Sequence, residues 1–392
     1  MLKQTYHYFE RKLAARKMRS LRAKVIALTG SHGKTSTGQA VTTVLSERYK
    51  VAQTDLNLDP IYAIPQLIKK LKNEDYAVVE LAVDKPGQMQ EYLKMVKPTV
   101  GVLTGIAPVH ADSEHLGSIE GIMKEKSVLL KNLPNEGYLV CNADDPKVVE
   151  MSKSTKARLV KYGFSKEADL VIREVKVSLK GTSILLVTKK GSLQLQLKLL
   201  GKQQAYVAAA AAAVGLEEGL TLSQVKTGLE KLEPMSGRMS LEKGPLGTIL
   251  INDARRANLS STLVGVETLA EIETNRKIAV IGEMGEMGDY EESGHREVGK
   301  AIAKNPPTFL VTVGPATKFV VEEALKGMPN DRVVYTSDVF EAAEKLKEIL
   351  QPGDFIYLKG SLLKHLERIP LILEGKKVDS DEIASHRYEV YD

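Results

Sequence analysis

The sequence has a single cysteine and no apolar run long enough to cross a bilayer. One thiol, Cys141, excludes an internal disulfide framework, and without a cysteine cluster there is no cysteine-based structural zinc site. The chain also begins without the pattern of a signal peptide. We therefore expect a protein of the reducing cytoplasm with no membrane-spanning segment.

Neither positive nor negative charge strongly dominates the sequence. The 392 residues are 43% hydrophobic and 27% charged, with a net charge of +5. This length and composition predict two or three domains with cores of their own. Because basic stretches interleaved with aromatic residues are lacking, we expect no nucleic-acid partner.

The first 24 residues carry much of the positive charge. Their only acidic residue is Glu10, and the basic ones are Lys3, Arg11, Lys12, Arg16, Lys17, Arg19, Arg22 and Lys24. Leu2, Tyr6, Phe9 and Leu13 recur at helical spacing, so residues 1–23 are predicted to form a basic helix. This helix either lies on the body of the protein or contacts an anionic membrane surface, an anionic substrate or a partner protein.

A phosphate-binding loop is the strongest motif. The apolar run Val25–Leu28 leads into Thr29-Gly30, then Gly33-Lys34-Thr35, then an Ala/Val/Leu-rich segment. This order predicts a buried strand, a tight loop and a helix whose N-terminus suits an anion. Lys34 would reach the β- and γ-phosphates of a nucleotide, and the Thr35 hydroxyl would hold Mg²⁺. The spacing is shorter than that of the usual P-loop.

Buried strands alternate with helices from residue 24 to about 153. Strands are expected at 24–29, 76–81, 99–104 and 138–141, which predicts an α/β domain with a mainly parallel sheet. Nucleotides bind at the carboxyl ends of such strands. Glu80 and His110 come at or just after strand ends and could face the loop.

The middle of the chain has a different pattern. Between about 158 and 200, short alternating runs predict a small antiparallel section with turns at Lys180-Gly181 and Lys190-Gly191. Residues 205–214 are almost all alanine and predict a tightly packed helix.

A second α/β pattern follows a hinge at 234–238. Strands are expected at 248–251, 278–282, 309–314, 333–335 and 355–358, with helices between them. We therefore place a central ATP-binding domain at 24–235 and a Rossmann-like C-terminal domain at 236–392.

Several motifs in one order resemble the Mur ligase family over roughly residues 24–375. These ATP-dependent enzymes join a carboxylate to an amine in cell-wall peptide synthesis, and folylpolyglutamate synthase is a relative. The resemblance implies ATP contacts from Thr29, Gly30, Ser31, His32, Gly33, Lys34, Thr35, Ser36, Asn142, Arg238 and Asp253. It implies Mg²⁺, or Mn²⁺ in its place, on Thr35, Glu80 and His110.

The resemblance assigns catalytic roles to Lys34, Lys126, His110 and Arg238. Lys126 matches the lysine that is carbamylated in this family. From its neighbours alone, which include Lys124 and Glu125, it would lie on a solvated helix face. Glu80 read alone could equally be a cap or salt-bridge residue.

One branch of the family, the ligases that add D-alanyl-D-alanine, shares further motifs at 282–289, 295–299 and 358–361. The sequence also departs from these patterns, and the loop between His110 and Gly117 is two residues longer than in that branch. Only about two dozen residues precede the loop where a UDP-sugar domain is expected. Gly201-Lys202-Gln203-Gln204 replaces the family's Gly-x-His-Asn. Arg255 and Arg256 replace a Tyr-Asn pair, either as a solvated pair or as partners of a carboxylate or phosphate on the substrate.

These motifs together predict an ATP-dependent carboxylate–amine ligase that acts through an acyl phosphate. Its substrates would be a peptide-bearing carboxylate and an amino acid or dipeptide amine. The alternatives are a ligase for a pseudomurein-type peptide, a polyglutamate or a folate-like tail, and a non-ligating ATP-binding switch.

Overall fold

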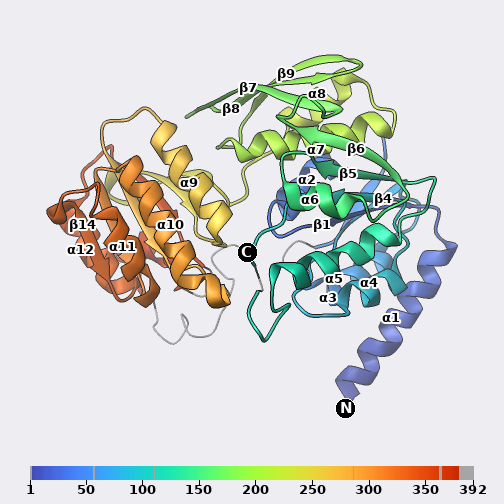
Figure 1. Cartoon of the computed structure of the whole chain (residues 1–392), viewed down its shortest axis with the longest axis horizontal. Coiled ribbons are helices and arrows are strands. Elements are labelled where there is room, and N and C mark those ends of the chain that lie inside the picture. Colours follow the sequence, from blue (N-terminus) through green and yellow to red (C-terminus); the bar gives the residue numbers. More distant parts are fainter. Residues whose placement is uncertain (1, 56–57, 110, 286, 362–363, 379–392) are drawn as a thin grey trace. The chain divides into compact units, whose positions relative to one another are not determined.

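The computed structural model describes residues 2–55, 58–109, 111–285, 287–361 and 364–378, with side chains from residue 8 onward (Figure 1). The chain forms two compact units. The first comprises Met1–Val175, Ser183–Leu197 and Gln203–Leu232. The second comprises Lys176–Thr182, Lys198–Lys202 and Glu233–Asp392. Within the described residues, no helix is both long and apolar enough to span a membrane.

The first sheet has nine strands in the order β2-β3-β1-β4-β5-β6-β7-β8-β9. Their bounds are β1 Lys24–Thr29, β2 Val51–Gln53, β3 Tyr76–Glu80, β4 Val100–Leu103, β5 Tyr138–Asn142, β6 Arg158–Gly163, β7 Leu170–Ser178, β8 Gly181–Thr188 and β9 Gly191–Leu197. Neighbours from β2 to β7 pair in parallel. Two-residue turns join β7 to β8 and β8 to β9, and turns this short connect only antiparallel strands. The predicted α/β fold is confirmed.

Strand β6 corrects one expectation. The sequence pattern predicts that β6 belongs to the antiparallel section, but β6 pairs in parallel with both β5 and β7. Helix α6, Pro146–Ser152, supplies the crossover that parallel pairing to β5 requires. The three-residue strand β2 was not predicted, because so short a run carries no periodic signal.

Helices cover both faces of the first sheet. They are α1 Leu2–Ser20, α2 Lys34–Leu45, α3 Pro60–Lys70, α4 Gln88–Met95, α5 Ile119–Lys131, α7 Gln203–Glu217 and α8 Leu222–Glu230. Val25, Ala27, Ala77 and Val79 share one core with residues of α1, α3, α4 and α5. On the other face α2 packs on α7, whose alanines 208–213 are fully buried. Their small side chains allow the close approach, as their sequence predicted.

The Glu218 carboxylate accepts hydrogen bonds from three strands at the edge of the sheet where these strands begin. Lys24, Tyr76 and Tyr138 are the first residues of β1, β3 and β5. Their side chains donate hydrogen bonds of 2.6, 2.7 and 2.7 Å to Glu218, which directly follows α7. The Glu218 side chain is only 7% exposed. Glu218 therefore fastens the alanine-rich helix to three strands.

The second unit has a six-stranded sheet in the order β10-β11-β15-β12-β13-β14. The strands are β10 Ser240–Lys243, β11 Ile249–Asp253, β12 Lys277–Gly282, β13 Phe309–Val313, β14 Val333–Thr336 and β15 Phe355–Lys359. All pairs are parallel except β10 with β11. Helices α9 Leu259–Glu271, α10 Glu291–Lys304, α11 Lys318–Ala324, α12 Val339–Ile349 and α13 Ile369–Leu373 cover it, with one core on each face. Its predicted Rossmann-like pattern is confirmed; the edge strand β10 was not predicted.

Replacing Glu218 by Gln should destabilise the protein by about 1–3 kcal/mol at pH 7, because Lys24 loses its charged partner. Burial raises the pKa of Glu218, but the hydrogen bonds from Lys24, Tyr138 and Tyr76 outweigh it and leave the pKa below its ordinary value. The stabilisation is therefore present above the ordinary carboxyl pKa of about 4.3 and is lost as the pH falls below it. Urea unfolding at several pH values measures the difference.

The matched control is Glu217→Gln, whose carboxylate pairs with the exposed Arg158. It should change the unfolding free energy by less than about 1 kcal/mol. Equal stability of wild type and Glu218→Gln at pH 7 would contradict the assignment.

Candidate active site

The loop between β1 and α2 rests on the loop that follows β4. The Ser31 N–H donates to the Gly105 carbonyl at 2.7 Å, and the Thr104 hydroxyl donates to the His32 carbonyl at 2.5 Å. Gly30 has φ +148°, and a Cβ there would lie 2.1 Å from Thr104 Oγ1. Only glycine therefore fits at position 30.

The loop leads directly into the start of α2, where backbone N–H groups can bind an anion. Gly33, with φ 75°, is the N-cap residue of α2. Because glycine has no side chain, the N-cap residue makes no hydrogen bond to the first backbone N–H groups of the helix. Lys34 Nζ donates to the Gly30 carbonyl at 2.9 Å, which holds it over the loop. Thr35 is 7% exposed, and Ser36 is half-buried beside it. This geometry suits a nucleotide phosphate.

Two carboxylates lie at the same edge of the sheet. Glu80 ends β3, the parallel neighbour of β1, and Asp84 follows four residues later. Glu80 Oε2 and Asp84 Oδ1 are buried, and no hydrogen-bond partner is found for either within the described residues. Unsatisfied buried carboxylate oxygens are costly, and a bound cation would satisfy them.

Lys126, on α5, lies close enough to Glu80 and Asp84 for their charges to act on it. It is 3% exposed, so the solvated-face interpretation of its helix is wrong. Burial, and then the positive charge of Lys34, hold the pKa of its amine well below the ordinary lysine value, while Glu125, Glu80 and Asp84 oppose the shift. Burial therefore disfavours the charged form of this amine relative to a lysine in water.

Glu125 and Asp84 were missed from the sequence. Glu125 accepts hydrogen bonds from the Gly87 and Met89 N–H groups at 2.9 and 2.8 Å, so it caps the start of α4 and fixes α5 beside it. Neither residue belongs to a motif with a known spacing. Only their burial next to Lys126 identifies them.

The donors present fit a hard cation. Glu80, Asp84 and the Thr35 hydroxyl offer oxygen atoms, which Mg²⁺ prefers. Within the described chain, no three His, Cys, Asp or Glu side chains form a ready metal cage. Mg²⁺ needs no such cage, because it keeps waters and binds nucleotide phosphates. His110, the other expected ligand, lies outside the described residues.

A polar chain links the loop to the ends of β5 and β6. Asn142 donates to the Thr104 carbonyl at 3.3 Å and accepts from the Asp144 N–H at 3.0 Å. Asp144 in turn accepts from the Phe164 N–H at 2.6 Å. The Phe164 ring meets Tyr206 edge to face at 5.4 Å. These two aromatic residues, also missed from the sequence, stand beside the expected nucleotide contact Asn142.

His32 is half-buried in the same loop. Burial, followed by the charge of Lys34, lowers the pKa of its imidazole, and Asp145 opposes the shift. His32 is therefore neutral at physiological pH and adds no charge to the phosphate site.

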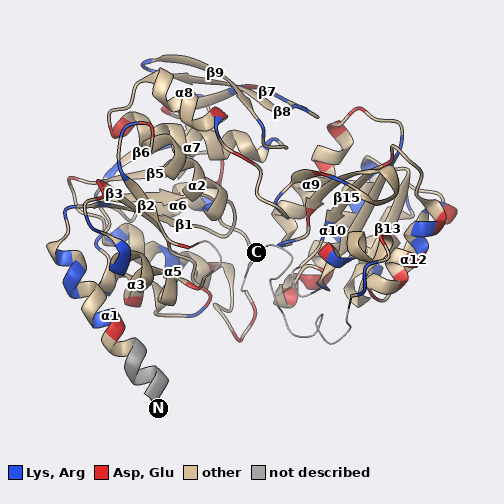
Figure 2. Cartoon of the chain, turned by 180° about the vertical axis from the view of Figure 1, so that it is seen from behind, with Lys and Arg blue, Asp and Glu red and all other residues tan. Residues whose placement is uncertain are grey.

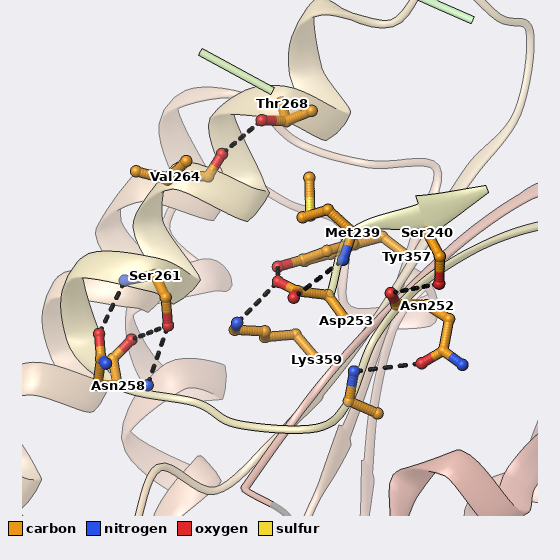
Figure 3. A network of polar contacts seen from close by, with 11 residues as sticks. Met239, Ser240, Asn252, Asp253, Asn258, Ser261, Val264, Thr268, Tyr357 and Lys359 are labelled. Carbon is orange, nitrogen blue, oxygen red and sulfur yellow. Dashed lines mark hydrogen bonds and ion pairs between the residues drawn. The ribbon is translucent and has the colours of Figure 1, made fainter. Parts of the chain in front are cut away.

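In the second unit Asp253 is the centre of a polar network (Figure 3). Its carboxylate accepts from Lys359 Nζ at 2.7 Å, from the Tyr357 hydroxyl at 3.2 Å and from the Met239 N–H at 3.2 Å. The charge of Arg238 also reaches it. Asp253 therefore holds the segment after the predicted hinge against β11 and β15.

The two arginines that depart from the family pattern differ in setting. Arg255 is only 8% exposed, and its N–H donates to the Gly237 carbonyl at 3.1 Å. Arg256 is exposed. The solvated-pair interpretation is therefore wrong for Arg255 and holds for Arg256.

The carboxyl edge of the second sheet is fixed by Glu283. Its side chain accepts from the Ala316 N–H at 2.5 Å and pairs with Lys364, and its carbonyl accepts from the Ser361 N–H at 2.9 Å. His295 is fully buried: Nδ1 donates to the Glu291 carbonyl at 2.7 Å, and Nε2 accepts from the Met284 N–H at 3.1 Å. Both residues hold loops in place.

Comparison with known proteins agrees with these features. The Mur ligase middle domain matches residues 28–215, and the Mur ligase glutamate ligase domain matches residues 237–362. The UDP-N-acetylmuramoyl-tripeptide–D-alanyl-D-alanine ligase of Bacillus subtilis is 30% identical over 360 residues, which are 91% of this chain and 77% of that enzyme.

Solved structures give the same result. MurF from Acinetobacter baumannii is 26% identical with a TM-score of 0.85, covering 94% of this chain and 81% of its own. MurF from Thermotoga maritima, solved in complex with ADP, is 22% identical and shares the fold, with a TM-score of 0.82 over 97% of this chain and 85% of its own. The chain therefore belongs to the Mur ligase family, and it is a MurF-like, ATP-dependent ligase that forms peptide bonds.

Proposed function

We propose that this chain activates a peptide-bearing carboxylate with ATP and joins it to an amino acid or dipeptide amine through an acyl phosphate. The observation that carries the proposal is the buried Lys126 amine with Glu80 and Asp84 around it, at the sheet edge that bears the phosphate loop. The reaction needs neutralised phosphate charge and fixed positions more than covalent help from the protein.

The residues of the first unit divide this work. Lys34 and the N–H groups that begin α2 bind the phosphates. Thr35 and Glu80, together with the proposed ligand His110, would hold Mg²⁺, or Mn²⁺ in its place, which when bound neutralises phosphate charge. Asn142 would contact the nucleotide; the Thermotoga maritima enzyme, which shares this fold, was itself solved in complex with ADP. In the second unit, Arg238 and Asp253 are our proposed further ATP contacts.

We propose that Lys126 is carbamylated. An uncharged amine can add CO₂ with the release of one proton, which leaves a carbamate anion in place of a lysine that would otherwise carry a positive charge. The lowered pKa of Lys126 supplies the uncharged amine, and the carbamate would orient the cation beside Glu80. Its burial protects the product from exchange with solvent.

The substrates are proposed from the relatives and from Arg255. The B. subtilis relative is named for UDP-N-acetylmuramoyl tripeptide and D-alanyl-D-alanine. We propose a cell-wall peptide of this kind as the carboxylate. A buried guanidinium at 255 suits a carboxylate on the incoming amine, so an amine with a free α-carboxylate is favoured.

We retain 24–235 and 236–392 as the proposed catalytic domains and the cytoplasm as the proposed location, which suits the buried free thiol Cys141. Pseudomurein-type peptides, polyglutamate and folate-like tails are the alternative substrates. A non-ligating ATP switch is the alternative activity, but it would have no need of the buried lysine.

ADP release by the purified protein should require both a carboxylate and an amine. The experiment supplies ATP, Mg²⁺ and muramyl peptides with or without UDP, each paired with amines that include D-alanyl-D-alanine. We expect release only with matched pairs. Release that ignores every pair, or ATP binding without any release, would contradict ligation.

Lys126→Ala should lower kcat by about 10²–10³-fold and leave ATP binding within a fewfold, because the proposed carbamate acts on the metal rather than on the nucleotide. Wild-type protein in ¹³C-bicarbonate should show a carbamate resonance that the variant lacks. Lys124→Ala, at the exposed neighbour, should behave as wild type. A wild-type protein without the resonance would rule out carbamylation.

Arg255→Ala should raise KM for the amine by about tenfold or more, with a smaller effect on KM for ATP, because a carboxylate partner is lost. Arg256→Ala serves as the exposed control and should leave both constants nearly unchanged. The comparison uses initial rates with the best pair of the panel. An equal change in both variants would remove Arg255 from substrate recognition.

A further inference from the structure

Helix α1 packs on the first unit along only one of its faces. Ala14 is buried in the core, and Met18 and Leu21 pack partly buried against it. Lys17 donates to the Lys69 carbonyl at the end of α3 at 2.8 Å. These contacts come from the second half of the helix and from Leu21, which directly follows it, and the opposite side of the described part of α1 is exposed.

The outer face carries large apolar side chains in solvent. Tyr8, Phe9 and Leu13 are 48%, 58% and 67% exposed. At about 100° per residue they lie within an arc of roughly 140°, on the side away from Ala14 and Met18. Leu13 is the most exposed large apolar residue described in the chain. Such a patch marks an interaction surface.

Basic side chains share this arc. By the same helical rotation, Lys12 and Arg16 fall between the apolar residues in angle, and Arg19 has nearly the angle of Tyr8, about three turns further along the helix. All three are exposed, and Lys12 lies over the Tyr8 ring at 4.5 Å from its centroid. Figure 2 shows the blue segments along α1. Neighbouring α3 ends in exposed Lys69 and Lys70, which extend the charge beyond α1.

We propose that α1 binds the surface of an anionic lipid bilayer. Aromatic and leucine side chains would enter the headgroup boundary, and the interleaved lysine and arginine side chains would contact lipid phosphates. A second copy of this chain fits less well, because pairing the two outer faces would bring two strongly cationic helices together. This inference does not depend on the proposed substrates.

The test is co-flotation of the full chain with vesicles. We expect binding to vesicles of phosphatidylcholine with 30% phosphatidylglycerol, little binding to phosphatidylcholine alone, and release as salt is raised, because the charge attraction is screened. Binding that is equal for both vesicle types, or absent from both, would overturn the proposal.

Two double variants separate the contributions. Arg16→Glu with Arg19→Glu should weaken partitioning by at least about 25-fold, since each basic residue near the surface contributes about fivefold. Phe9→Ser with Leu13→Ser should also weaken it by at least about tenfold. Lys153→Glu with Lys156→Glu changes two exposed lysines elsewhere on the first unit and should have little effect.

Circular dichroism and thermal unfolding check that each variant is folded, and the wild-type salt series tests the proposal independently of any variant. Sedimentation velocity tests the alternative partner, a second copy of this chain. A wild-type dimer that becomes monomeric on Phe9→Ser with Leu13→Ser, without vesicle binding by the wild type, would assign the face to a second copy. Loss of vesicle binding in the Lys153/Lys156 variant equal to that in the Arg16/Arg19 variant would show general surface charge instead.

Discussion

The close approach of the loop after β1 to the loop after β4 is the constraint on which the nucleotide site depends. Gly30 leaves no room for a side chain against Thr104, and the Thr104 hydroxyl is bonded to the His32 carbonyl. Two parallel strands thereby fix the start of α2. The neighbouring parallel strands end at the same edge of the sheet. Glu80 and Asn142, which are far from the loop in sequence, therefore lie at the same edge as the loop.

Charged side chains are buried at this edge of the first sheet. A buried lysine, a second lysine on the loop and three nearby carboxylates form an arrangement that would be unfavourable in a merely structural core. Glu80 and Asp84 retain buried oxygen atoms for which the described residues supply no partner. An unsatisfied group of this kind is expected where a ligand completes the site.

The second unit uses charge differently. Asp253 is satisfied by Lys359, Tyr357 and the Met239 N–H, and Glu283 is satisfied by loops from two neighbouring strands. These networks make a rigid edge rather than a reactive one. The two sheets therefore differ in how they hold charge, and the buried Arg255 of the second unit is one of the features in which this chain departs from the family pattern.

The two α/β patterns, the phosphate loop and the alanine-rich helix could all be predicted from the sequence, because hydrophobic periodicity, glycine positions and chain order are local properties. The sequence could not place β6 in the parallel sheet, since strand pairing depends on a crossover and on what covers each face. It could not separate Arg255 from Arg256 or remove Lys126 from solvent, because burial is decided by neighbours distant in sequence. The contacts of Asp84, Glu125 and Glu283 are decided by the tertiary structure, which alone brings their carboxylates close to their partners.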